Sequence, residues 1–196
     1  MNKTFTSKDF KIIPFKSQKE WERWLHKNHK VSEGIWLKLF KKDSGIKTIT
    51  YSQALDEALC YGWIDGQLKS YDDKSWIQKF TPRRNKSIWS KRNTENINRL
   101  IKLGKMKPAG LSEVEKAKSD GRWQKAYDSP GKMTIPEDFL KQLSKDKKAK
   151  VFFNELNKAN TYAIAWRLQT AKKPETREKR MKLILEMLSK GEKFHG

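Results

Sequence analysis

Residues with strand-forming patterns occur only in the first half of this 196-residue sequence, and this restriction limits the folds open to it. Short runs of β-branched and aromatic residues bounded by turn residues are typical of strands. They occur at Phe10–Phe15, Ile35–Phe40, Trp63–Lys69 and Ser75–Thr81. Only helical patterns follow residue 105. The sequence therefore predicts an α+β fold: helices and a small sheet containing antiparallel strands in the N-terminal half, then an all-helical C-terminal half.

The change of pattern also predicts two domains. The segment Lys105–Gly110 marks the boundary, which gives an α+β domain at residues 1–105 and a helical domain at 106–196 that packs on it. Pro14 places the first strand at a sheet edge, because proline cannot donate to a ladder. In the third strand Ile64 and Leu68 alternate with polar residues. We expect a half-buried strand, joined by a hairpin to the fourth.

The helix signals in both halves are caps followed by apolar stripes. Ser17 with Glu20 predicts a capping box. Trp21, Trp24 and Leu25 follow at i, i+3 and i+4, so both tryptophans are predicted to lie in the core. Further helix starts are predicted at Thr50 or Ser52, at Ser90 and, through another capping box, at Ser112.

The net charge of +21 is the strongest global property of the chain. Residues 1–105 carry 23 basic and 11 acidic side chains and residues 106–196 carry 21 and 12, so there is no separate basic tail. A charge this large favours encounters with polyanions and strongly salt-dependent binding. The alternative is a lysine-rich solvated surface without a specific partner.

A basic, aromatic window between Lys74 and Thr94 contains seven basic residues and no acidic one. Arginine forks and hydroxyl groups at a helix start are suited to binding an anion, and tryptophans offer stacking faces. Arg177 and Arg180 could complete such a site. The sequence thus predicts a groove for an anionic or phosphate-bearing ligand, formed by Trp63, Asp65, Arg83, Arg84, Trp89 and Asn93.

Asp65 admits two other interpretations. It could form an ion pair with Arg83 or Arg84 and act as a structural brace. It could also serve as an acid or base in an enzyme, although no second carboxylate is placed beside it by the sequence.

Other chemistry is weakly supported, and we expect no cofactor, metal site or catalytic residue. The single cysteine, Cys60, lies at the end of its predicted helix and is expected to be a buried structural residue. His26 and His29 lack further ligands for a metal. The N-terminus lacks the apolar core of a signal peptide, and no stretch is long enough to span a bilayer. A cytoplasmic protein is expected.

Several long motifs resemble the bacteriocin-protection family of bacterial proteins, also called the YdeI/OmpD-associated family. In the first half they are WERWL, GIWL, YSQALDEALCYGWIDGQ, TPRR and SIWSKRN; in the second they are PEDFL and WRLQTAKKPETREKR. The resemblance implies a cytoplasmic bacterial protein with an α+β part and a helical part, and no cofactor or catalytic residue.

Three functions follow as hypotheses. The first is a non-enzymatic protective or stress-related protein with the anion groove. The second is a nucleic-acid-binding protein without sequence preference, since no known recognition motif is present. The third is an enzyme that uses Asp65.

Overall fold

A computed structural model describes residues 10–129 and 131–195. The expectation that the N-terminus lacks a signal peptide concerns mainly residues outside this part. The contacts divide the chain into two units, which we describe separately. The first unit comprises residues 1–87 and 93–124, and the second comprises residues 88–92 and 125–196. The boundary predicted after residue 105 falls between two helices of the first unit. Packing of the C-terminal domain on the first stays a prediction.

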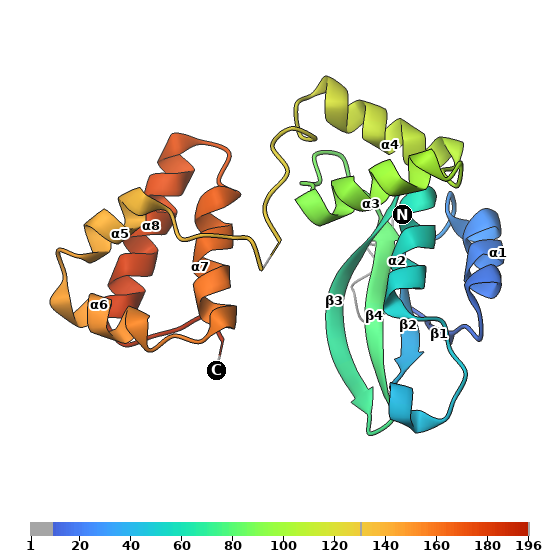
Figure 1. The fold of residues 1–196 in the computed structure, drawn as a ribbon, viewed down its shortest axis with the longest axis horizontal. Helices are drawn as coiled ribbons and strands as arrows, with labels where there is room; N and C mark the ends of the chain where they lie inside the picture. Colours follow the sequence, from blue (N-terminus) through green and yellow to red (C-terminus); the bar gives the residue numbers. More distant parts are fainter. Residues whose placement is uncertain (1–9, 130, 196) are drawn as a thin grey trace, which may run out of the picture. The chain divides into compact units, whose positions relative to one another are not determined.

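The first unit contains a four-stranded sheet and four helices (Figure 1). Its elements are β1 (Ile12–Pro14), α1 (Gln18–Asn28), β2 (Ile35–Phe40), a short 3₁₀ turn η1 (Lys42–Ser44), α2 (Tyr51–Cys60), β3 (Trp63–Asp72), β4 (Ser75–Pro82), α3 (Lys91–Lys102), whose first two residues belong to the second unit, and α4 (Pro108–Ser119).

The strands lie in the order β1-β2-β4-β3, which confirms a sheet containing antiparallel strands. β1 is an edge strand as predicted and pairs in parallel with β2, with Ile12 opposite Trp36. The β3–β4 hairpin is antiparallel, and β4 also pairs antiparallel with β2. Paired residues point to the same face, so Ile35 and Phe80 share the face that carries the core.

Helices α1 and α2 lie beside the sheet (Figure 1), and a cluster of aromatic side chains between them and this face forms the core of the first unit. Trp21 is fully buried, and its ring centroid lies 5.7 Å from that of Phe80 and 6.4 Å from that of Trp63. Its indole N–H donates to the Ala54 carbonyl over 3.0 Å, which ties α1 to α2. Trp24 stacks on Trp21 at 5.3 Å and remains half-buried.

The exposure predicted for β3 is wrong at Leu68 and at Trp63, which its alternation with Ile64 placed on the outer face. Trp63 is buried, whereas Leu68, expected on the inner face, is 62% exposed. The register of β3 against β4 shifts between Asp65 and Leu68. The shift pairs Leu68 with Gln78, which shares a face of β4 with Phe80, so the bulge does not turn Leu68 away from the core face. β3 is an edge strand, so its second half extends beyond the core.

Two predicted caps also differ from the structure. Ser17 accepts from the Glu20 N–H over 3.3 Å, but the Glu20 carboxylate accepts from Lys16 N–H rather than closing a capping box. Ser112 does not begin a helix, because α4 already begins at Pro108. Proline suits the first helical position, since its fixed φ is helical and no N–H is needed there.

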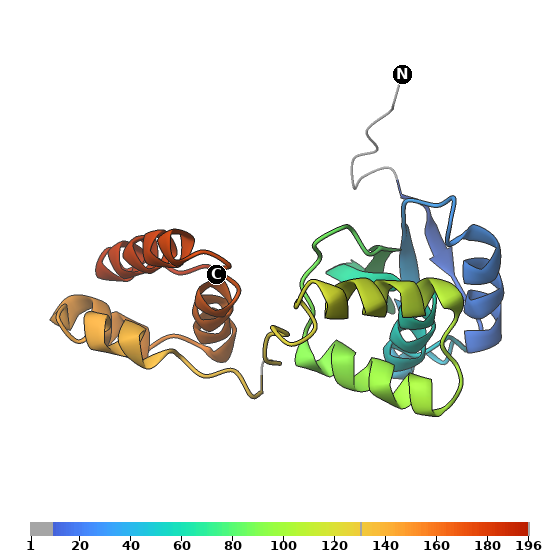
Figure 2. The ribbon, with the colours of Figure 1, turned by 90° about the horizontal axis from the view of Figure 1, so that it is seen from above.

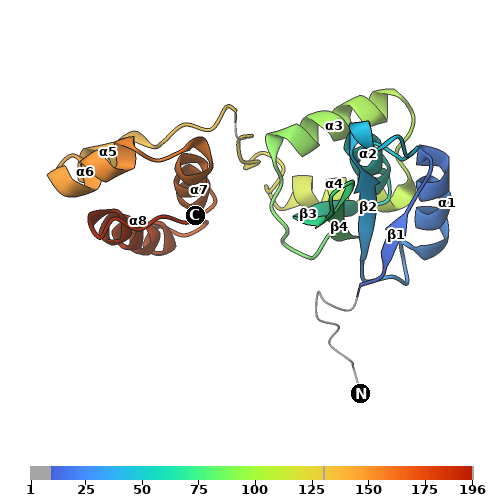
Figure 3. The same cartoon turned by 90° about the horizontal axis from the view of Figure 1, so that it is seen from below.

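Besides the first two residues of α3, the described part of the second unit contains four helices, which confirms the prediction of an all-helical C-terminal half. Its helices are α5 (Glu137–Leu143), α6 (Lys147–Asn154), α7 (Lys158–Gln169) and α8 (Pro174–Ser189). α8 packs against both α6 and α7 (Figures 2 and 3). The apolar core includes Phe139, Ile164, Ile184 and Leu188. Of residues 10–129 and 131–195, none belongs to a helix that is long and apolar enough to cross a membrane.

Candidate functional site

Trp63 was predicted to stack on a ligand and lies instead within the core of the first unit. Its side chain is 1% exposed, its indole N–H donates to the His29 carbonyl over 3.2 Å, and its ring packs edge-on against Trp24 at 5.7 Å. A ring buried among aromatic neighbours contributes mainly packing energy. A ligand could reach Trp63 only if this core rearranged.

Asp65 lies on the same face of the sheet as Trp63 and is hydrogen-bonded to a residue of α2. Its carboxylate Oδ2 accepts a hydrogen bond from the Tyr51 hydroxyl, the first residue of α2, over 2.6 Å. Asp65 forms no ion pair with any residue of the described part, so the predicted brace with Arg83 or Arg84 is wrong. Asp65 pairs with Phe80 in the ladder, whereas Arg83 follows the end of β4 at Pro82.

The remaining four predicted residues lie in different environments. Arg83 is buried, and its backbone N–H donates to the Gly62 carbonyl over 3.0 Å. Arg84 is exposed and belongs to a loop in which its backbone N–H donates to Ser87 Oγ over 3.1 Å. Asn93 is buried in α3, and Trp89 is buried in the second unit. An anionic ligand for these six residues therefore stays a prediction from the sequence.

Cys60 is buried at the end of α2, and burial raises the pKa of its thiol to about 12, with smaller contributions from Glu57 and Asp56. The thiolate is the reactive form of cysteine. Near pH 8, close to an ordinary thiol pKa of about 8.5, the native protein should therefore resist iodoacetamide, while the protein in concentrated guanidinium chloride should react fully. Mass spectrometry after a timed reaction measures this. Rapid, complete labelling of the native chain would contradict a buried structural role.

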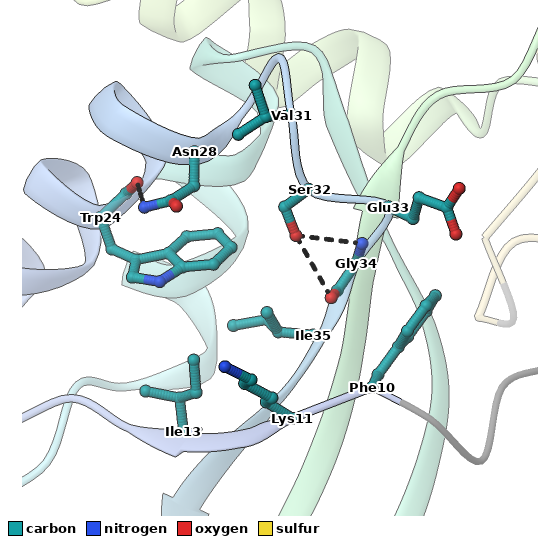
Figure 4. Close-up of a pocket in the computed structure, with 10 residues that line it drawn as sticks. All are labelled: Phe10, Lys11, Ile13, Trp24, Asn28, Val31, Ser32, Glu33, Gly34 and Ile35. Atoms are coloured by element: carbon teal, nitrogen blue, oxygen red, sulfur yellow. Dashed lines mark hydrogen bonds between the residues drawn. The ribbon is translucent and has the colours of Figure 1, made fainter. Parts of the chain in front are cut away.

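One pocket of the first unit, about 370 Å³ in volume, lies between the end of α1 and strands β1 and β2 (Figure 4). Its polar groups are largely engaged with the neighbouring backbone. Asn28 Nδ2 donates to the Trp24 carbonyl over 2.7 Å, and Ser32 Oγ accepts from the Gly34 N–H over 3.3 Å. The Glu33 carboxylate points away from the other lining side chains (Figure 4). This pocket presents little chemistry to a ligand.

The second unit contains a pocket with stronger chemistry, which we call the arginine pocket. It has a volume of about 300 Å³ and lies between α7, α8 and the chain after α8. Two guanidinium groups and an apolar wall form it. Its lining residues are Trp166, Arg167, Arg180, Leu183, Ile184, Met187 and Phe194.

Backbone carbonyl groups hold both arginines of this pocket. Arg167 Nη1 donates to the Ala163 carbonyl over 3.1 Å. Arg180 Nη1 donates to the Arg167 carbonyl over 2.7 Å and to Thr170 Oγ1 over 3.4 Å, so it ties α8 to the end of α7. A guanidinium has five N–H donors, so several remain for a ligand on each side chain.

The chain end completes the pocket. The buried Asn160 side chain accepts from the His195 N–H over 2.9 Å and donates to the His195 carbonyl over 3.2 Å. This pair of bonds fixes the residues after α8. Phe194 is thereby placed beside Arg167, whose Cζ lies 3.7 Å from the centroid of the phenyl ring. Such cation–π contact keeps the guanidinium plane in position.

The two arginines lack the counter-charge that others have. Arg99 pairs with Asp56, Arg122 with Asp120 and Arg177 with Asp138. Neither Arg167 nor Arg180 forms an ion pair with a residue in the ranges 10–129 and 131–195. Burial lowers the pKa of Arg167, and the nearby positive charge of Arg180 lowers it further. Two close cations without a carboxylate favour the entry of an anion.

Sequence reasoning had named Arg180 and missed Arg167. A signal for both was present, since neither has an acidic residue three or four positions away on its helix, where ion pairs form. Arg177 shares that property and nevertheless pairs with Asp138, 39 positions earlier in the sequence. Only the packing of α5 against α8 distinguishes these cases. In the described part, no group of three or more His, Cys, Asp or Glu side chains is arranged to hold a metal ion.

Comparison with protein families assigns the two units separately. Residues 13–113 match the model of a domain of unknown function, DUF8412. Residues 132–191, which contain Arg167 and Arg180, match the model described as bacteriocin-protection, YdeI or OmpD-associated. The curated proteins and the solved structures gave no match.

The chain belongs to the DUF8412 family through its N-terminal domain, and residues 132–191 form a bacteriocin-protection, YdeI/OmpD-associated domain. The resemblance seen in the sequence is therefore confirmed for the second half. The motifs of the first half, including the long run from Tyr51 to Gln67, fall within the other family.

Proposed function

We propose that this protein is a non-enzymatic binding protein whose ligand is a small anion with an apolar part, held in the arginine pocket. The pair Arg167 and Arg180, close together and without a carboxylate, is the observation that carries the proposal. Planar guanidinium groups bind carboxylate and phosphate oxygens through paired N–H donors. The anion would supply the counter-charge that the two side chains otherwise lack.

The wall of the pocket supports an amphipathic ligand rather than an inorganic ion. Leu183, Met187 and Phe194 lie beside the guanidinium groups, and Trp166 adds an aromatic edge. Small-molecule sites commonly combine an apolar lining with a few charged groups that orient the ligand. An aryl or alkyl carboxylate or phosphate fits this combination. Family membership supports a protective role, in which sequestering such a molecule is the function.

The test is calorimetric titration of the full chain with phenyl phosphate and benzoate, beside inorganic phosphate. The aryl anions should bind more tightly than inorganic phosphate because they also bury apolar surface. Arg167→Gln and Arg180→Gln should each weaken aryl-anion binding about ten-fold or more, since a hydrogen bond to a charged group contributes about 1.5–3 kcal/mol. Phe194→Ala should reduce the advantage of the aryl anions over inorganic phosphate.

Arg177→Gln is the matched control for these variants. Arg177 lies on α8 one turn before Arg180, but it pairs with Asp138 and does not line the pocket. Its replacement should leave anion binding unchanged. The proposal is wrong if none of the three anions binds at millimolar concentrations, or if the control weakens binding as much as Arg180→Gln.

The net charge of +21 favours a second candidate function, binding of nucleic acid without sequence preference. Affinity for a mixed-sequence single strand should then fall linearly with salt concentration on a log–log plot, because bound counterions are released. The anion-pocket proposal instead expects the affinity for an aryl anion to fall only slightly with salt concentration, and Arg180→Gln to weaken that affinity. Catalysis by Asp65 has less support, because its carboxylate is engaged by Tyr51.

The cytoplasm is the location that we propose, on the basis of a single buried cysteine.

A further inference from the structure

The first unit contains a second pocket with charged walls, which we call the polar pocket. Its volume is about 520 Å³, within the usual range of small-molecule sites of about 300–1,000 Å³. It lies where the start of α1, the middle of α2 and the α3–α4 connection meet. The lining residues are Gln18, Lys19, Glu22, Glu57, Gly104, Lys105 and Lys107.

Glu57 is the buried carboxylate in this wall. It is 8% exposed, and its Oε1 accepts a hydrogen bond of 2.6 Å from Gln18 Nε2. Within residues 10–129 and 131–195, Oε2 has no hydrogen-bond partner and Glu57 forms no ion pair. Burial raises the pKa of Glu57, while the Gln18 bond and the lysines oppose that rise. Oε2 is not among the buried atoms that lack a partner, so it is accessible from the pocket, where the carboxylate charge attracts a cationic donor.

Lysine side chains also line the polar pocket. Lys107 Nζ is 3.3 Å from Glu22 Oε1 and its charge is thereby matched. Lys105 is exposed, and it has no ion pair with a described residue. Its charge nevertheless acts on Glu57, as does that of Lys107, so these groups lie near the buried carboxylate. The pocket therefore offers an acceptor for a cation at Glu57 and a donor for an anion at Lys105.

We propose that the polar pocket binds a small zwitterion with a primary ammonium and a carboxylate group, the chemistry of a free amino acid. The ammonium donates to Glu57 Oε2, and the carboxylate accepts from Lys105. Gln18 positions Glu57 through its amide bond. This pocket and its ligand are independent of the arginine pocket, since they belong to the other unit and need opposite charges on one molecule.

The experiment is ligand-observed NMR and calorimetry on the full chain with alanine, glutamine and phenylalanine, each beside its N-acetyl and its carboxamide form. At least one free amino acid should bind. Its N-acetyl and carboxamide derivatives, which each keep only one of the two charges, should bind at least about ten-fold more weakly, because each loses a charged hydrogen bond. Glu57→Gln, which keeps the shape of the side chain, should cause a similar loss for the free amino acid.

Glu115→Gln is the control, since Glu115 is an exposed carboxylate on α4 that does not line the polar pocket. Lys105→Gln is a second test variant at an exposed position, which keeps the proposal testable if Glu57→Gln fails to fold. The proposal is overturned if no free amino acid binds at millimolar concentrations, or if the N-acetyl form binds as well as the parent. Equal losses in Glu57→Gln and Glu115→Gln would also overturn it. Arg180→Gln should leave amino-acid binding unchanged.

Discussion

Replacing Trp21 by alanine should lower the free energy of unfolding of the first unit by about 3–5 kcal/mol, the usual cost of truncating a buried aromatic side chain. The Trp21 ring contacts Phe15, Trp24, Trp63 and Phe80, so its removal leaves a cavity between the sheet and both covering helices. The Ala54 carbonyl also loses its donor. A buried acceptor without a partner adds its own desolvation cost.

Guanidinium chloride unfolding followed by far-UV circular dichroism measures this loss. Trp21→Phe should fall between the wild type and the alanine variant, because it keeps most of the packing and loses the indole N–H. Tyr71→Ala is the control. Tyr71 is an aromatic residue of the same sheet that is 49% exposed, and its loss should cost less than about 1 kcal/mol. Similar losses for Trp21→Ala and Tyr71→Ala would contradict the proposed core.

Replacing Gly110 by alanine should destabilise the protein although alanine is the better helix former. A Cβ at position 110 would lie 2.3 Å from the Cys60 carbonyl oxygen and 2.7 Å from that of Leu59. Both are backbone atoms at the end of α2, so no flexible side chain can move away. α4 would have to withdraw from α2, at a cost of about 1–3 kcal/mol or more. In an open helix the same substitution stabilises by about 1 kcal/mol.

Gly131→Ala provides the control for the expected loss of stability in Gly110→Ala. No atom lies within 4 Å of the Cβ position there, and the backbone φ is not in the left-handed region. Its thermal midpoint should equal or slightly exceed that of the wild type. The close approach of α4 to α2 is refuted if Gly110→Ala is as stable as Gly131→Ala in the same thermal melts.

Local patterns predicted most of the elements of this fold. The apolar stripe of Trp21 and Leu25 predicted α1, and Thr50, one of the two predicted caps, is the N-cap of α2, which begins at Tyr51. The pattern of β3 was less informative, because the second half of this edge strand extends beyond the core and leaves Leu68 exposed. Ser112 misled for a different reason. A capping motif that occurs inside a helix has no free N–H groups to satisfy.

The candidate sites were less predictable than the elements. From the sequence, Asp65 was expected to pair with an arginine, and the structure gives it the Tyr51 hydroxyl instead. Arg180 was one of several basic residues on its helix; in the structure it donates to the Arg167 carbonyl, whereas Arg177 pairs with Asp138. In the sequence, Glu57 has the pattern of an ordinary helix residue. Only the structure places Gln18, 39 positions away, within hydrogen-bonding distance of it.

The sequence by itself determined the fold class, the change from an α+β half to a helical half, and membership in the bacteriocin-protection family for its second half. Hydrophobic period and caps act over a few residues, and short-range patterns record them directly. Only the tertiary structure decided which polar and charged side chains lie near one another: Arg167 with Arg180, and Glu57 with Gln18 and Lys105. These pairs arise from helices packing together, and no local pattern encodes the register of one helix against another.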